Sequence, residues 1–161
     1  MANPTVKKAT GRDEAIVNFG ARFLGRLDRW IYRMTGGNKK FRLLGRGKAD
    51  ALLLTTVGRK SGQKRTTPLL YLKDGDTIVL AASKAGMPHH PLWYLNITAN
   101  PEVDVEVGRE KIAMVARQAN AAEKSRLWPR LVEIYPAYAE YQLLTDREIP
   151  VIILTRRPAS R

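Results

Sequence analysis

The sequence predicts a mainly β protein with helices, an α+β domain built around an antiparallel barrel. Six segments of five to seven residues, rich in β-branched and aliphatic side chains, alternate with short turns. Short strands joined in this way favour a barrel. With 161 residues, of which 44% are hydrophobic and 27% charged, the chain has the size of one compact domain with its own core.

The segment before the first strand divides into an arm and a helix. Residues 1–12 are predicted to be a disordered basic arm, and residues 13–161 a single domain. Over residues 13–35, apolar side chains recur at three- and four-residue spacings beside a stripe of arginines, which predicts an amphipathic helix. Its apolar face either docks on the protein's own core or lies on an acidic membrane, and both alternatives stay open.

Three strands are expected next, as an antiparallel meander. Ala51–Val57 and Thr67–Leu72 are apolar and rich in β-formers, with a basic loop between them. The pair Asp74-Gly75 supplies the positive φ that a tight hairpin needs, so a third strand is predicted at Thr77–Ala82.

A second hairpin, two helices and a last strand complete the expected barrel. Val103, Val105 and Val107 alternate with acidic residues, which is typical of a half-buried strand, and a turn leads from them into Ile112–Ala116. The other expected elements are a short helix at Pro91–Ala99, a longer helix at Ala121–Tyr135 that is disturbed at Pro129, and a strand at Pro150–Leu154.

The net charge of +13 is concentrated in the first two fifths of the chain. Residues 1–65 carry 16 Lys/Arg against 4 Asp/Glu. This asymmetry indicates an anionic partner, which could be nucleic acid, an acidic membrane surface or a phosphorylated cofactor. The alternative is a charged surface that only keeps the protein soluble.

Composition excludes several classes of chemistry. The absence of cysteine excludes disulfides, thiolate metal sites and cysteine nucleophiles. The two histidines, His89 and His90, are sequence neighbours that rarely reach one metal ion, so no metal site is expected. No segment resembles a secretory signal or approaches the ~18 apolar residues of a membrane span. We therefore expect a cytoplasmic protein, either free or peripheral on the inner face of the cell membrane.

The loop Gly58–Arg65, with the sequence GRKSGQKR, is a candidate phosphate site. It holds four cations, one hydroxyl and two glycines between two apolar strands. A turn bounded by glycines exposes backbone N–H groups, which together with Lys and Arg side chains can bind an anion. The spacing is not that of a Walker A loop, so triphosphate hydrolysis is not indicated. The alternative is a solvated hairpin tip.

Aromatic and hydroxyl side chains form the other candidate site. Ser83 and Lys84 follow the third strand, and Trp93 could cover a flat ring, although a core tryptophan is the alternative. Tyr135, Tyr138 and Tyr141 recur every third residue and so stay near one side of a helix or 3-10 turn. Phenols can donate to a developing oxyanion while uncharged; alternatively they seal the barrel end. No catalytic triad or paired carboxylates are visible, so difficult chemistry should come from a cofactor.

An ordered set of motifs resembles the deazaflavin-dependent nitroreductase family. The motifs run from Leu52 to Leu154 and read LLLTTVGRKSGQKRTTPLLYL, AASKAG, HPLWYLNITANPEV, RLWPRLVEIYPAYAEYQ and TDREIPVIIL. The resemblance implies a split β-barrel related to FMN-binding barrels. It also implies coenzyme F420 as the cofactor, an 8-hydroxy-5-deazaflavin with a phospholactyl oligoglutamate tail.

The resemblance also implies roles for individual residues. Arg59, Lys60, Ser61 and Arg65, assisted by Lys84, would hold the phosphate and glutamate tail. The residues that would surround the deazaflavin are Thr66, Thr67, Pro68, Ser83, Leu92, Trp93, Tyr94 and Asn96. Tyr135, Tyr138 and Tyr141 would stand over the cofactor and form the substrate pocket.

The implied reaction is hydride transfer from C5 of the reduced cofactor, F420H2, to a hydrophobic quinone, enone or nitroaromatic. The protein would hold the acceptor carbon ~3–3.5 Å from C5 and then supply a proton. We expect Tyr138 as the first donor and Ser83 as the second, with solvent as an alternative. Leu70 stands where some nitroimidazole-reducing members have tyrosine, so nitroimidazole reduction is not expected.

Two other readings stay open. One is an FMN- or haem-using barrel of the same fold class. The other is a basic module without catalysis that binds a membrane surface or nucleic acid. Specific nucleic-acid binding is not expected, because the basic residues are not interleaved with aromatics on a sheet face and no motif for base readout is present.

Overall fold

The computed structural model describes residues 50–158. In chain order the elements are β1 (Asp50–Val57), β2 (Lys64–Asp74), β3 (Thr77–Ala81), a short turn η1 (Lys84–Gly86), α2 (Leu92–Ala99), β4 (Glu102–Val107), β5 (Glu110–Gln118), α3 (Ala121–Ile134), α4 (Ala137–Leu143) and β6 (Val151–Arg156). The predicted amphipathic helix and basic arm lie outside the described residues.

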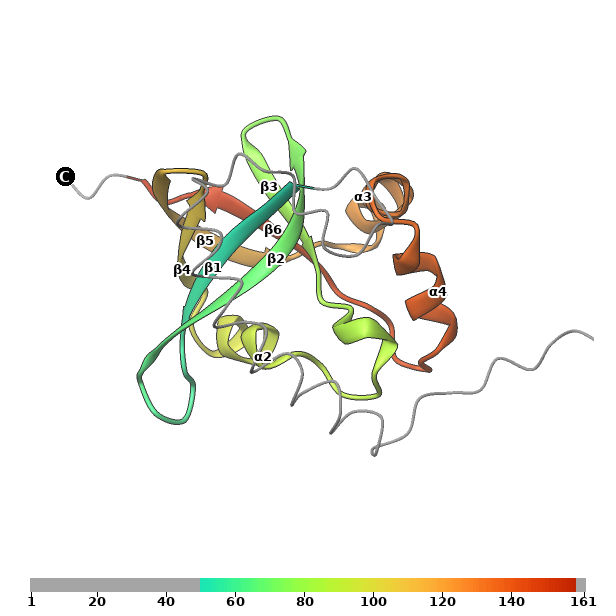
Figure 1. The fold of residues 1–161 in the computed structure, drawn as a ribbon, viewed down its shortest axis with the longest axis horizontal. Coiled ribbons are helices and arrows are strands. Elements are labelled where there is room, and N and C mark those ends of the chain that lie inside the picture. Colours follow the sequence, from blue (N-terminus) through green and yellow to red (C-terminus); the bar gives the residue numbers. More distant parts are fainter. Residues whose placement is uncertain (1–49, 159–161) are drawn as a thin grey trace, which may run out of the picture.

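The strands close into an antiparallel barrel in the order β1-β2-β3-β6-β5-β4. Figure 1 shows the barrel with α3 and α4 together on one side and α2 near one end. All six predicted strands are present and the predicted fold class is confirmed. The structure extends β2 back to Lys64 and β5 forward to Gln118, because both strands continue pairing with a neighbour beyond their apolar cores.

The core has two parts, one inside the barrel and one outside it. Alternate residues of β3 divide between them: Ile78 and Leu80 join the inner cluster with Trp93 of α2, whereas Val79 joins the outer cluster with Leu131 of α3. β6 alternates in the same way. Both strands are therefore buried on two faces, which explains the unbroken apolar run that ends the barrel.

Helix α3 is held against the β2–β3 hairpin. Asn120 and Glu123 form a capping box at its start. The predicted disturbance at Pro129 does not interrupt the helix, since this exposed proline forfeits only its own hydrogen bond to the preceding turn. Arg126 and Arg130 each donate to a different oxygen of Asp74, at 2.8 and 2.5 Å. These bonds hold the pKa of the Asp74 carboxyl down at about 2.

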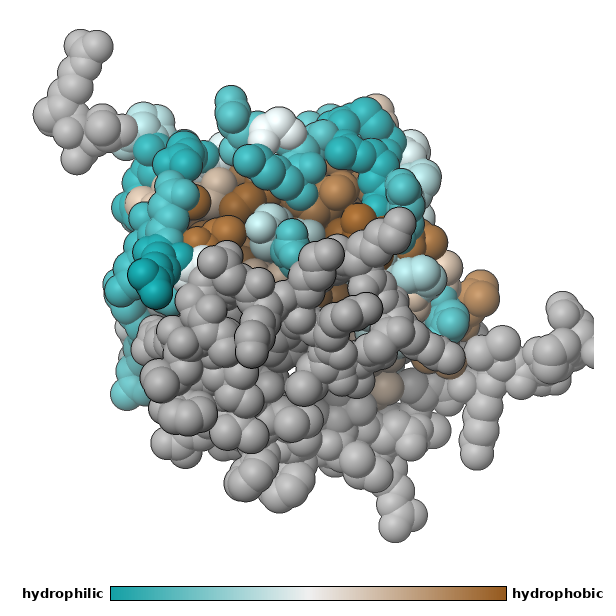
Figure 2. Space-filling model, turned by 45° about the horizontal axis from the view of Figure 1, so that its top comes forward, coloured by the Kyte–Doolittle hydropathy of each residue, from teal (hydrophilic) through white to brown (hydrophobic). Residues whose placement is uncertain are grey.

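On the face shown in Figure 2, polar side chains border an apolar area of residues 50–158 along its upper edge and sides. No helix in this part of the chain is long and apolar enough to cross a membrane. The same residues contain no cluster of His, Asp and Glu that could bind a metal ion.

Candidate functional site

A cavity of about 230 Å³, here called the tyrosine cavity, opens between the barrel and the α3–α4 corner. Its walls come from β2, β3, η1, the start of α2 and the three tyrosines. The lining residues are Leu69, Leu70, Ala81, Ser83, Lys84, Ala85, Pro91, Trp93, Tyr135, Tyr138 and Tyr141. The structure thus brings together six of the residues predicted for the site from separate motifs.

The three tyrosines form one ring cluster. Tyr135 ends α3, and Tyr138 and Tyr141 lie on α4. Their ring centroids are 5.1 to 6.4 Å apart, and the hydroxyl oxygens of Tyr135 and Tyr141 are 3.3 Å apart. Such edge and tilted contacts fix the ring positions, so the phenols form a rigid wall.

Tyr138 is the most enclosed of the three. The side chain is 5% exposed, and within residues 50–158 its hydroxyl has no hydrogen-bond partner. Every fully buried polar side-chain atom in this part of the chain has a hydrogen-bond partner. The Tyr138 oxygen has none, so it is not fully buried, and it opens into the cavity that Tyr138 lines. Burial, with the neighbouring Tyr135 and Tyr141, raises the pKa of this phenol well above its usual value. Tyr138 is therefore a neutral donor at physiological pH.

Ser83 faces the same cavity from the loop after β3. It is 9% exposed, and its hydroxyl makes no capping bond to η1. The following residues, Lys84, Ala85 and Gly86, all have positive φ, a conformation that L-residues rarely adopt. The side chain of Arg147 donates to three backbone carbonyls of this loop. We did not predict this role of Arg147; its only sequence signal is its place in the charged segment TDREIP just before β6.

The basic turn, Gly58–Arg65, joins β1 to β2 in a form that differs from the prediction. Its amides are used internally: Gly58 donates to the Gln63 carbonyl, and Ser61 and Gly62 both donate to the Gly58 carbonyl. The turn is also tight at Gly58, because a Cβ there would lie 3.2 Å from the Gln63 carbonyl and 2.8 Å from the Ser61 hydroxyl, which would have to rotate away. The expectation that these three backbone N–H groups are available to a phosphate is wrong, and only the side-chain part of the predicted phosphate site remains as a prediction.

The side chains of the basic turn are exposed. Lys64 is paired with Asp104 at 3.1 Å, and Arg65 donates to the Gln63 side chain. Among residues 50–158, Arg59 and Lys60 have no carboxylate partner within ion-pair distance. Arg59 and Lys60 therefore make no side-chain bond within residues 50–158, and Arg65, which bonds only the neutral Gln63 amide, also has no carboxylate partner there.

Helix α2 connects the basic turn to the tyrosine cavity. Near its start, buried Trp93 lines the cavity. One turn later, buried Asn96 accepts from the Arg59 backbone N–H at 3.2 Å and donates to the Thr56 hydroxyl at 3.1 Å. The predicted cofactor role of Asn96 is untested, but its side chain is already engaged in holding the turn.

Strand β2 makes the same connection along the barrel. Arg65 stands at the turn and Leu70 lines the cavity. Five residues of strand span ~17 Å. Between them lie Thr66, whose hydroxyl is 2.8 Å from that of Thr55, and then Thr67 and Pro68.

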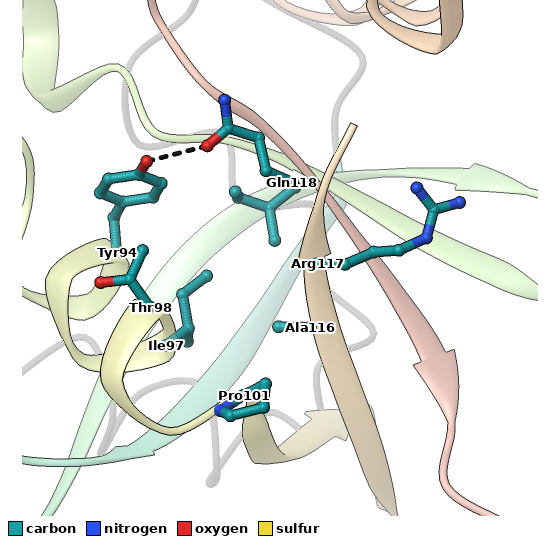
Figure 3. A pocket seen from close by; sticks show the side chains of 8 residues that line it. Tyr94, Ile97, Thr98, Pro101, Ala116, Arg117 and Gln118 are labelled. Atoms are coloured by element: carbon teal, nitrogen blue, oxygen red, sulfur yellow. Dashed lines mark hydrogen bonds between the residues drawn. The ribbon is translucent and has the colours of Figure 1, made fainter. Parts of the chain in front are cut away.

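Two predicted residues of α2 lie away from the tyrosine cavity. Leu92 is 68% exposed. The Tyr94 hydroxyl donates to Gln118 at 2.9 Å, beside a second cavity between α2 and β5. Figure 3 shows this bond, with Arg117 pointing away from the other labelled side chains. Successive helical residues are about 100° apart, so Leu92, Trp93 and Tyr94 cannot face one site together.

Comparison with known proteins identifies the family. The family described as F420H(2)-dependent quinone reductase matches residues 24–156. A reductase of Mycobacterium tuberculosis with that name is 42% identical over 135 residues, which cover 82% of this chain and 89% of the relative. A solved F420-H2 dependent reductase is 45% identical, with a TM-score of 0.61, over 65% of this chain and 92% of its own.

A more distant structure shares the fold alone. A haem-binding protein of Mycobacterium smegmatis has a TM-score of 0.52 at 17% identity, over 68% of this chain and 47% of its own. Barrels of this shape therefore do not by themselves specify a cofactor. The family match does, because its name states the cofactor: this chain is an oxidoreductase that uses coenzyme F420, and it belongs to the F420H(2)-dependent quinone reductase family.

Proposed function

We propose that the protein uses reduced F420 to reduce a hydrophobic quinone in the tyrosine cavity. The observation that carries this proposal is a buried, neutral phenol in an apolar cavity, joined by β2 and α2 to an exposed cluster of cations. Bound reduced F420 would supply a hydride at this position. The relatives' names, which specify quinone reductases, support the substrate class.

The residues of the site suit F420, which has a flat ring at one end and an anionic tail at the other. Leu69, Leu70 and Trp93 offer apolar contact to a ring in the tyrosine cavity. Arg59, Lys60 and Arg65 offer charge-assisted bonds to a phosphate and carboxylates. The ~17 Å along β2 between these groups matches a ligand that is extended rather than compact.

The cavity supplies the hydrogen-bond donors that quinone reduction needs. Reduction places negative charge on a quinone oxygen, and the Tyr138 hydroxyl can donate a hydrogen bond to it. Since the pKa of Tyr138 is raised, the phenol holds its proton and stabilises the oxyanion by a hydrogen bond, and solvent supplies the proton that completes the hydroquinone. Ser83 is the second donor, and Tyr135 and Tyr141 fix the position of the first. An enone or nitroaromatic of similar size would use the same donors.

The test is oxidation of F420H2 by the purified chain, followed through the fluorescence of oxidised F420 with a short-chain naphthoquinone as acceptor. We expect turnover with the quinone, weaker turnover with an enone, and no comparable binding of FMN. Tight FMN binding without F420 affinity, or no F420H2 oxidation at any quinone concentration, would overturn the proposal.

We further propose that the protein works against the inner face of the cell membrane, where hydrophobic quinones reside. The positive charge before β2 supports this, because acidic lipids attract clustered Lys and Arg. Co-sedimentation with vesicles that contain one third phosphatidylglycerol, compared with neutral vesicles, tests it. Equal binding to both would remove the electrostatic basis.

A further inference from the structure

The loop Ser83–His90, here called the Ser83 loop, has little regular structure of its own. Its internal backbone bonds are two: Gly86 N–H to the Ser83 carbonyl and Met87 N–H to the Lys84 carbonyl, both 3.0 Å. Three successive residues have positive φ. Such a conformation is unfavourable by itself, so neighbouring groups must hold it.

Arg147 is the neighbouring group that holds it. Its Nε donates to the Met87 carbonyl at 2.9 Å, Nη1 to the Ala82 carbonyl at 3.2 Å, and Nη2 to the Ser83 carbonyl at 2.7 Å. Nη1 also lies 3.2 Å from Nδ1 of His90. The rigid guanidinium fork thus contacts the start, the middle and the end of the loop at once.

The backbone of Arg147 is in turn fixed to α4. The Gln142 side chain donates to the Arg147 carbonyl and accepts from the Ile149 N–H, both at 2.9 Å. Gly86 of the loop also approaches α4 so closely that a Cβ there would lie 2.7 Å from the Tyr141 carbonyl. A chain of contacts therefore runs from the tyrosine helix through Gln142 and Arg147 to the loop that presents Ser83.

We propose that Arg147 is a positioning residue for the reductase reaction: it sets the loop with Ser83 and Lys84 at a fixed distance from Tyr138 across the cavity. The inference rests on the proposed function, since it assumes that the reaction occurs in that cavity. Arg147 does not line the cavity and acts only through the loop. Its loss would remove no lining residue, but it would release the wall that Ser83, Lys84 and Ala85 form.

The experiment compares Arg147→Gln and Arg147→Lys with the wild type. Lysine keeps the charge but is a single nitrogen that cannot reach three separated carbonyls. We expect kcat for naphthoquinone reduction to fall roughly 10- to 100-fold in the Gln variant and about ten-fold in the Lys variant, because small misplacements of reacting groups cost rates of this size. The KM for F420H2 should change about two-fold or less, as the basic turn is untouched.

Hydrogen exchange gives a readout without catalysis. The amides of Gly86 and Met87 should exchange at least about ten-fold faster in both variants, since local opening becomes easier when the carbonyl contacts are lost. Arg117→Gln is the matched control. Arg117 on β5 makes two bonds of 2.7 Å to Glu123 in the first turn of α3, so its loss removes a well-bonded guanidinium that does not contact the Ser83 loop.

The outcomes separate the two proposals. Wild-type kcat and exchange rates in a folded Arg147→Lys would overturn the positioning role, even if Arg147→Gln failed to fold. A lower melting temperature with unchanged kcat per folded molecule would also overturn it, because that is a purely structural effect. A wild-type protein that reduces no quinone would defeat the proposed function alone, since the exchange rates still report the hold of Arg147 on the loop.

Discussion

The two ends of β2 are built in opposite ways. At the basic turn, the backbone amides are bonded within the turn, and the charged side chains extend into solvent with two of them unpaired among residues 50–158. At the tyrosine cavity, the side chains are buried and locked by ring contacts, and the hydroxyls of Tyr138 and Ser83 are left without bonds in the same part of the chain.

Under the proposed function, this difference would separate cofactor binding at the basic turn from the reaction in the tyrosine cavity. Exposed cations can follow a long, variable anionic tail, but each contact is weakened by solvent and salt. A buried phenol cannot adapt, but its hydrogen bond is stronger in surroundings of low polarity than in water. We expect changes at the turn to alter cofactor affinity, and changes at the cavity to alter turnover.

The largest expected effect is at Tyr138. Tyr138→Phe removes only the hydroxyl, so kcat for quinone reduction should fall about a hundred-fold, as for a lost oxyanion donor. The dissociation constant for F420, measured by fluorescence titration, should change about two-fold or less. Unchanged turnover would mean that Ser83 or solvent, and not Tyr138, donates to the oxyanion. The turnover of Ser83→Ala would then distinguish these two.

The next effect tests how tightly the cavity is assembled. Gly86→Ala places a methyl group 2.7 Å from the Tyr141 carbonyl at a φ of +73°. The free energy of unfolding should fall by ~2 kcal/mol, combining the backbone strain with the overlap. Gly75→Ala is the control: it has a similar φ of +60° but nothing within 4 Å, and should lose ~1 kcal/mol. If urea unfolding showed the same loss of unfolding free energy for both variants, α4 would move away from the added methyl group at no measurable cost.

The sequence was sufficient for the strands but not for how they close. Alternating valines and the Asp74-Gly75 turn are local signals, and they predicted β4 and the β2–β3 hairpin. The pairing of β3 with β6 joins segments about seventy residues apart, so no local pattern reveals it. The resemblance, rather than periodicity, indicated a split barrel.

The site was predictable to a similar degree. Each motif indicated candidate site residues, and the structure places Ser83, Trp93 and the three tyrosines around one cavity. Two things depended on three-dimensional detail. The basic turn used its own amides, and the positions of Leu92 and Tyr94 followed from helix geometry around Trp93. Arg147 donates to backbone carbonyls, and a sequence does not show which backbone carbonyls a side chain will contact.

A smaller effect is expected at the basic turn. Replacing Lys60 and Arg65 together by alanine should raise the dissociation constant for F420 about ten-fold, because charge-assisted bonds at exposed sites lie at the low end of their range. The salt dependence of binding should also weaken, while kcat at saturating cofactor stays the same. Lys64→Ala, which removes a cation paired with Asp104, should do much less. If Lys64→Ala cost half as much binding free energy as the double variant, each lost charge would count equally, and total charge rather than the positions without a carboxylate partner would set the affinity.

The smallest effect concerns the ion pairs that hold α3, and with it Tyr135, on β2. Because the folded pKa of Asp74 is about 2, below its usual 3.8, the folded state favours the charged carboxylate. Its stabilisation is complete above pH ~4 and is lost as the pH falls towards 2. At pH 7, Asp74→Asn should lower the free energy of unfolding by about 1 kcal/mol, after allowing for the exposed arginines. The two proteins should converge in urea unfolding near pH 2. If the two unfolding free energies still differed near pH 2, Asp74 would act through hydrogen bonding alone, and its charge would not contribute to holding α3 on β2.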